Sequence, residues 1–149
     1  MKLTLRIWRQ VGPGDAGRYE SYEVPDARPE MSVLELLDAL NSRLVDGGEE
    51  PVAVDSDCRE GICGACGVTV DGRPHGPAEN TPSCHQRLNP YSDGDTLRIE
   101  PLRAEAFPVI RDLVVDRSAL DGVIEAGAFV QVPAGSAPDA DVILQGHDE

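Results

Sequence analysis

The N-terminal residues alternate between apolar and polar side chains. Leu3, Leu5 and Ile7 fall on one side of an extended chain, and this period of two predicts a strand over about residues 2–9. After a loop that contains Gly-Pro-Gly the alternation resumes, so a second strand is expected over about residues 19–24. The two strands together are typical of a β-hairpin.

The period then changes from two to about 3.6 residues. Ser32 and Glu35 have the spacing of a capping box, which marks the start of a helix. From Val33 to Leu44 apolar side chains recur at helical spacing and form one apolar face. The pair Gly47-Gly48 predicts the end of the element. The sequence therefore predicts one amphipathic helix directly after the hairpin.

Three shorter apolar runs follow the helix. Residues 52–54, 68–70 and 97–99 each begin and end with Val, Leu or Ile, which is typical of short strands. Asp71-Gly72 predicts a tight turn after the second run. Two strands, a helix and further short strands indicate an α+β fold. The order of the elements fits a β-grasp.

The chain divides into three zones by composition. We expect a folded domain over residues 1–103. Residues 104–132 contain an apolar segment from Phe107 to Val115, and a short helix capped by Asp116 or Ser118 is expected after it; this zone is interpreted as a linker. Residues 133–149 are rich in Pro, Ala and Asp and are expected to form a flexible tail.

Charge and hydropathy exclude several functions. The chain has 13 Lys and Arg against 27 Asp and Glu, a formal net charge of −14, which disfavours nucleic acid and anionic membrane surfaces as partners. No apolar run is long enough for a membrane-spanning helix, so no direct membrane insertion is expected. The N-terminus lacks the apolar core of a signal peptide. Cysteines in a reducing compartment favour metal or redox chemistry over disulfides.

The four cysteines carry the strongest chemical signal. Cys58, Cys63 and Cys66 have the spacing C-x4-C-x2-C, and Cys84 follows after 17 further residues. This is the plant-type spacing of a 2Fe–2S cluster with a distant fourth ligand. Glycines between the ligands allow the backbone to wrap closely around a cofactor. A zinc site remains an alternative, although structural zinc sites usually pair two C-x2-C units, and so do disulfides or inert buried thiols.

The other candidate residues give weaker signals. His85 follows the fourth cysteine and is interpreted as a neighbour of the site or a surface group, while His75 and His147 are expected to be solvated. Trp8 falls on the polar side of the first strand and is expected to be an exposed ring packed on a neighbour. The sequence contains no Ser/His/Asp set, P-loop or Rossmann motif, so no catalytic residues are expected.

Two segments resemble a known family. Residues 58–66, Cys-Arg-Glu-Gly-Ile-Cys-Gly-Ala-Cys, resemble the C-R-E-G-x-C-G-x-C signature of the iron–sulfur subunits of succinate dehydrogenase and fumarate reductase. Residues 107–116, Phe-Pro-Val-Ile-Arg-Asp-Leu-Val-Val-Asp, resemble the P-V-I-x-D-L-V-x-D stretch that follows the ferredoxin domain there. The resemblance extends over about residues 3–130. The chain departs from the family pattern in two places. The spacing before Cys84 is longer, with residues 73–77 as the insertion, and Ala65 stands where Ser is common.

The resemblance implies a β-grasp ferredoxin domain that holds the 2Fe–2S cluster nearest the flavin. The partners it implies are a flavoprotein (FAD) subunit and, through a second domain, a membrane anchor subunit. That second domain would carry 4Fe–4S and 3Fe–4S clusters, and the chain ends before its cysteines. The complex would lie on the cytoplasmic face of the inner membrane. The residues expected at the cluster are its ligands Cys58, Cys63, Cys66 and Cys84, with Arg59, Gly61, Gly64 and Ala65 around them.

Three functions are compatible with these residues. The first is an electron-transfer subunit of a succinate dehydrogenase/fumarate reductase complex, which is an enzyme only as part of that complex. The second is a free-standing soluble 2Fe–2S ferredoxin, for which the apolar extension over residues 107–130 is unnecessary. The third is a β-grasp interaction module whose cysteines bind zinc or nothing.

Overall fold

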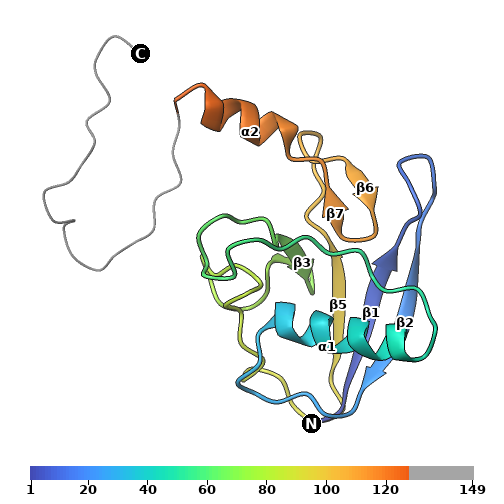
Figure 1. Cartoon of the computed structure of the whole chain (residues 1–149). Helices are drawn as coiled ribbons and strands as arrows, with labels where there is room; N and C mark the ends of the chain where they lie inside the picture. The colour runs from blue at the N-terminus through green and yellow to red at the C-terminus, as the bar shows by residue number, and fades with distance from the viewer. Residues whose placement is uncertain (128–149) are drawn as a thin grey trace, which may run out of the picture.

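The structure is a computed structural model that describes residues 1–127 (Figure 1). Its main sheet has five strands in the order β2-β1-β5-β3-β4. Strands β1 and β5 are parallel, and the other neighbouring pairs are antiparallel. A mixed sheet with one packed helix confirms the predicted α+β class. The strands are β1 (Leu3–Arg9), β2 (Arg18–Val24), β3 (Val68–Val70), β4 (Arg73–Pro74) and β5 (Thr96–Pro101).

Helix α1 (Val33–Asp46) lies across the sheet, as Figure 1 shows. The predicted capping box is present, because the Glu35 amide donates to Ser32 Oγ at 3.1 Å and the Ser32 amide donates to the Glu35 carboxylate at 2.6 Å. The apolar face of the helix and the inward side chains of β1 form one core with no solvent exposure at Leu5 or Leu36. This layer arrangement follows directly from the two sequence periods.

The strand expected over residues 52–54 is wrong. This segment lies outside any strand. Side chains bind most of its backbone groups, and the hydrogen bond from the Leu113 amide to the Ala53 carbonyl, at 3.1 Å, does not continue as a strand ladder. Asn41 of α1 brackets Val52, accepting from its amide at 2.8 Å and donating to its carbonyl at 2.9 Å. The Ala53 amide donates to the carboxylate of Asp112 at 2.9 Å. The segment is an extended connection from the helix to the cysteines.

A second, two-stranded sheet follows β5. It consists of β6 (Val109–Arg111) and β7 (Val114–Val115), and α2 (Ser118–Glu125) comes next. Helix α2 confirms the expected element, but its N-cap is Arg117 and not Asp116 or Ser118. Arg117 makes no side-chain capping hydrogen bond, while Asp116 accepts from the Ser118 amide at 2.9 Å. The sequence did not predict the hairpin. The expected tail over residues 133–149 lies outside the described residues.

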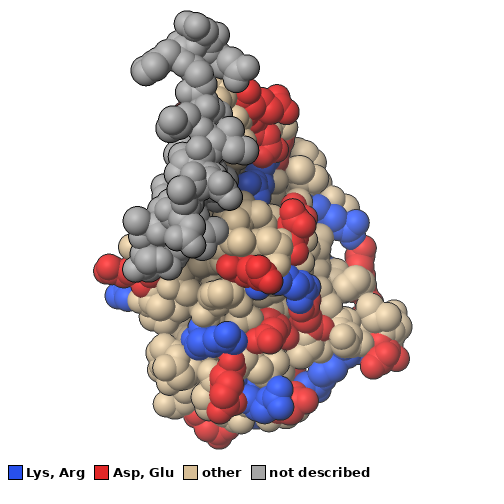
Figure 2. All heavy atoms as spheres, turned by 60° about the vertical axis from the view of Figure 1, so that its left-hand side comes forward, with Lys and Arg blue, Asp and Glu red and all other residues tan. Residues whose placement is uncertain are grey.

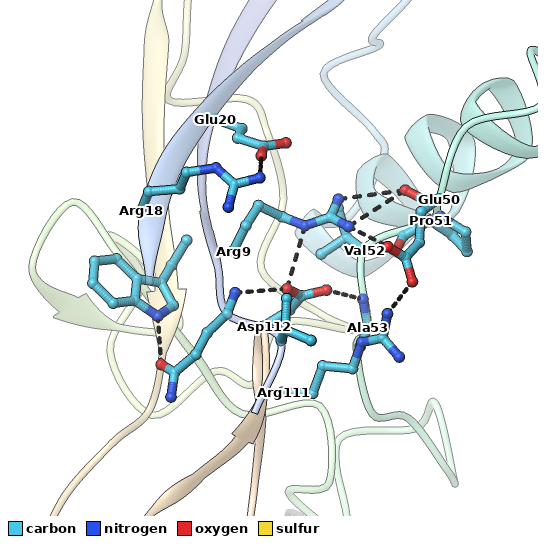
Figure 3. A network of polar contacts seen from close by, with 12 residues as sticks. Arg9, Arg18, Glu20, Glu50, Pro51, Val52, Ala53, Arg111 and Asp112 are labelled. Atoms are coloured by element: carbon cyan, nitrogen blue, oxygen red, sulfur yellow. Dashed lines mark hydrogen bonds and ion pairs between the residues drawn. The ribbon is translucent and has the colours of Figure 1, made fainter. Parts of the chain in front are cut away.

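Asp112 docks this hairpin onto the main sheet (Figure 3). Asp112 is 2% exposed. One oxygen of its carboxylate accepts from the Gln10 amide at 2.9 Å and forms an ion pair with Arg9 Nε at 3.3 Å. The other oxygen accepts from the Ala53 amide. One buried carboxylate thus joins the end of β1, the hairpin and the segment that leads to the cysteines.

The surface of the described part carries both signs of charge. The face in Figure 2 shows basic and acidic side chains interspersed over it, and nine ion pairs join such groups in residues 1–127. Over these same residues, no helix has the length and apolar character needed to cross a membrane.

Candidate metal centre

The four cysteines come from two segments that meet beside the first turn of α1. Cys58, Cys63 and Cys66 lie on the loop between the 52–54 segment and β3, and Cys84 lies on the long connection between β4 and β5. Cys66 and Cys84 are buried and pack against Leu34 of the helix. All four thiols are free, so the structure contains none of the disulfides left open by the sequence.

The N-terminus of α1 positions the segment of the fourth cysteine. The Leu34 amide donates to the Ser83 carbonyl at 3.1 Å, and the Val33 amide donates to the Gln86 carbonyl at 2.9 Å. These first-turn amides have no partner within the helix, so they are available to bind the chain on either side of Cys84. The capping box and the cysteine site are therefore parts of one local structure.

The surroundings of Cys58 and Cys84 differ, and each includes a second cysteine: Cys63 for Cys58 and Cys66 for Cys84. Hydrogen bonds from the amides of Glu60, Cys63 and Ile62 lower the pKa of Cys58 to about 7. Burial raises the pKa of Cys84 to about 11.

Backbone amides of the loop are directed at sulfur. The amides of Glu60, Ile62 and Cys63 lie 3.4, 3.4 and 3.3 Å from Cys58 Sγ, and the Ala65 amide lies 3.4 Å from Cys63 Sγ. Such donors stabilise thiolates and the added negative charge of a reduced cluster. The chain therefore provides an environment that favours anionic sulfur.

Positive backbone dihedral angles produce this orientation. Arg59, Gly61 and Gly64 have φ values of 56°, 74° and 66°, in the left-handed region that favours glycine. Arg59 is the one non-glycine residue of the three, and its side chain is bound by residues outside the stretch between the cysteines. Its guanidinium donates to both carboxylate oxygens of Asp38 on α1, at 2.6 and 3.3 Å, and to Ser56 Oγ at 3.3 Å. The ion pair raises the pKa of Arg59.

Gly64 is required by its backbone angle and not by crowding. If the loop were tightly packed, a Cβ added at Gly61 or Gly64 would clash with neighbouring atoms. Protein atoms come no closer than 3.4 Å to a Cβ built at Gly61, however, and none lies within 4 Å of a Cβ built at Gly64. A Cβ meets no clash at these positions because Gly64 is exposed and Gly61 is partly exposed. The φ of 66° still disfavours any side chain at Gly64.

Replacing Gly64 with valine is therefore expected to lower the free energy of unfolding by about 1–2 kcal/mol, the cost of a left-handed L-residue. Iron and sulfide content should fall with it, because the amides of the loop would turn away from sulfur. Gly14→Val is the matched control, since Gly14 has open space and no positive φ. Equal unfolding midpoints and equal iron contents for the two variants would show that the loop tolerates the change.

The arrangement fits a binuclear cluster better than a single ion. A 2Fe–2S cluster has two irons and takes four thiolates, which matches the four free cysteines on these two segments. A structural zinc ion needs its four ligands around one point. Within residues 1–127, no three His, Cys, Asp or Glu side chains are placed to hold one metal ion.

Three polar residues near the site were not predicted from the sequence. Ser83 is fully buried and its hydroxyl donates to the carbonyl of Cys66. Gln86 is also fully buried, and its amide group bonds the backbone of Ala78 in both directions, at 3.0 and 3.1 Å. Arg117 donates to the Cys63 carbonyl at 3.1 Å. No periodicity marks these residues, because each lies in irregular structure.

His75, His85 and Trp8 fall within the described residues, and His147 lies outside them. The expectation of a solvated His75 is wrong: the ring is half-buried, its Nδ1 accepts from the Val68 amide at 3.4 Å, and burial lowers its pKa. His85 is exposed beside Gly61. Trp8 packs on its neighbours as expected, with Tyr19 at 5.2 Å and Arg103 at 4.4 Å from the ring.

The fold and the four free thiols indicate a class of iron–sulfur protein. Comparison with known proteins identifies the family. Residues 4–121 match the model of the 2Fe–2S iron–sulfur cluster binding domain. The chain belongs to this family.

The relatives confirm the resemblance found in the sequence. The chain is 32% identical to the succinate dehydrogenase iron–sulfur subunit of Bacillus subtilis over 76% of its length and 42% of the relative. It is 41% identical to the fumarate reductase iron–sulfur subunit of Mycobacterium tuberculosis over 69% of its length and 36% of the relative. The chain thus spans less than half the length of these relatives.

A solved structure is similar over nearly the whole chain. It is a chain of the Mycobacterium smegmatis Sdh1 complex in the apo form, with a TM-score of 0.64 and 26% identity. The match covers 97% of this chain and 54% of that chain.

Proposed function

We propose that this chain is the ferredoxin part of the iron–sulfur subunit of a succinate dehydrogenase/fumarate reductase complex. The observation that carries the proposal is that two segments bring four free thiols together beside amides directed at sulfur. Cys58, Cys63, Cys66 and Cys84 would hold the two irons of the cluster. The bound cluster supplies a carrier for one electron at a time.

The residues around the ligands orient them. Gly61 and Gly64 supply the left-handed turns, and the Ala65 amide lies 3.4 Å from Cys63 Sγ. Arg59 contributes through Asp38 and the backbone of the loop and not through a free charge.

The partners follow from the complexes in which the relatives act. We propose a flavoprotein (FAD) subunit as electron donor or acceptor on one side. On the other side we propose a further domain with 4Fe–4S and 3Fe–4S clusters, leading to quinone and a membrane anchor on the cytoplasmic face of the inner membrane. The chain by itself is then no enzyme. A β-grasp domain over residues 1–103, a linker over 104–132 and a tail over 133–149 complete the proposal.

An EPR measurement tests the cluster. The purified chain, supplied with iron and sulfide, should turn brown, contain two irons and two sulfides, and give the signal of a one-electron-reduced 2Fe–2S centre after dithionite treatment. Uptake of one zinc ion instead, with no iron-dependent colour, would favour the interaction module.

A second measurement separates a subunit from a free ferredoxin. Added flavoprotein subunit should bind the iron-loaded chain and make its cluster reducible by succinate. The chain alone should show no succinate-dependent dye reduction, because succinate oxidation transfers two electrons and requires a hydride acceptor such as flavin. Steady turnover by the flavin-free chain would contradict the proposal, and a lack of affinity for the flavoprotein would favour the free ferredoxin.

A further inference from the structure

Arg117 reaches the cysteine loop from a distant part of the chain. It lies between β7 and α2, is half-buried, and donates from Nη2 to the carbonyl of Cys63 at 3.1 Å. The two residues are 54 positions apart. The C-terminal extension is therefore bound to the backbone of a cysteine that we propose as an iron ligand.

Arg117 makes no ion pair within residues 1–127, whereas Arg59 on the cysteine loop is paired with Asp38. The adjacent Asp116 accepts from the amide and the hydroxyl of Ser118. Among the described residues, no carboxylate thus lies within ion-pair distance of the Arg117 guanidinium.

The surroundings of Arg117 differ on its two sides. On one side, it is the only cation among the described residues that line a surface hollow beside Cys63, whose acidic groups are Asp55, Asp57, Asp116 and Asp121. On the other side, it lines an apolar cavity of about 100 Å³ with Leu102, Phe107, Val115 and Leu120. Apolar walls lower the local dielectric constant and strengthen the effect of a nearby charge. The positive charge of Arg117 therefore opposes the negative charges of these carboxylates, and the apolar cavity keeps solvent away from one side of its side chain.

We infer that Arg117 is a positioning residue that raises the reduction potential of the cluster. The inference rests on the proposed function, because it requires a cluster at the four cysteines. Reduction adds one electron and hence one negative charge to the site, and a fixed positive charge close by stabilises that state. The hydrogen bond to the Cys63 carbonyl keeps the charge in place. The same contact couples the potential to the docking of β7 and α2.

The test is an EPR-monitored redox titration of the iron-loaded chain. In Arg117→Gln the ratio of reduced to oxidised protein at a fixed potential should fall about tenfold, a shift of about 59 mV for a one-electron couple. Arg117→Lys should keep most of the wild-type potential, because it retains the charge. Arg18→Gln is the matched control: it removes the same charge from β2, at the opposite edge of the sheet from β3 and β4, and should leave the potential unchanged.

Each result decides the inference. A wild-type potential in Arg117→Gln, or an equal fall in Arg117→Lys, would overturn a role for the charge. Loss of the cluster in Arg117→Gln but not in Arg117→Lys would support a role for the charge. Loss of the cluster in both variants, with the unfolding midpoint of the metal-free chain unchanged, would overturn that role. A wild-type chain that binds no iron would instead refute the proposed function, and the inference with it.

Discussion

Replacement of Cys63 by alanine is expected to abolish the visible absorption of the iron-loaded protein. Cys63 is central to the site: its thiol accepts from the Ala65 amide at 3.4 Å, its amide donates to Cys58 Sγ at 3.3 Å and its carbonyl accepts from Arg117. Removing the sulfur leaves one iron with a single protein thiolate. Since metal binding also stabilises the fold of a small metalloprotein, the stabilisation that iron and sulfide confer should be lost as well.

The measurement is an absorption spectrum with iron and sulfide counts, together with thermal unfolding before and after loading. Ala65→Ser is the matched control, because it changes a neighbouring residue of the same loop without removing a ligand, and it should retain the cluster. A normal cluster in Cys63→Ala would show that the ligand set is different from the one proposed.

Replacement of Asp112 by asparagine should destabilise the protein by roughly 3–5 kcal/mol, the usual cost of removing one partner from a buried ion pair. The Arg9 and Asp112 side chains are 10% and 3% exposed, so the guanidinium would stay buried without its carboxylate. Asparagine tolerates the positive φ of 45° at this position, so the backbone is not the cause of the loss.

Chemical denaturation of the metal-free chain measures this loss. Arg111→Gln is the control: it removes the adjacent residue's exposed ion pair with Glu50, whose side chains are 41% and 66% exposed, and should cost at most about 1 kcal/mol. If the two variants unfold at the same denaturant concentration, the Asp112 network does not stabilise the fold. A further expectation is that Asp112→Asn weakens the Arg117 contact, since the hairpin that precedes Arg117 would no longer be docked.

The elements that could be predicted are those with local signals. The alternation of Leu3, Leu5 and Ile7 specified β1, and the pairing of Ser32 with Glu35 specified the start of α1. In both cases the information lies within one turn or a few residues of strand. The spacing of the cysteines along the chain likewise indicates the kind of cofactor, and the family match supports that choice.

Local signals failed where backbone groups bind to distant side chains. The 52–54 segment has the composition of a strand, but it binds the side chains of Asn41 and Asp112, which lie 11 and 59 residues away, and the backbone amide of Leu113. The β6–β7 hairpin is short and turns at Asp112, whose buried carboxylate has no counterpart in a sequence pattern. A charged residue in an apolar segment is usually exposed, and only its long-range partners made burial favourable here.

The sequence by itself determined the α+β class, the first hairpin, the helix and the number of thiols available to a cluster. Those properties depend on periods and spacings that are visible over a few residues. Only the tertiary structure decided that Cys84 lies beside Cys66, that Arg59 binds Asp38, and that Arg117 lies on the Cys63 carbonyl. These contacts depend on how the sheet, the helix and the hairpin pack together, because their partners are 18 to 54 residues apart along the chain and no local pattern specifies such distances.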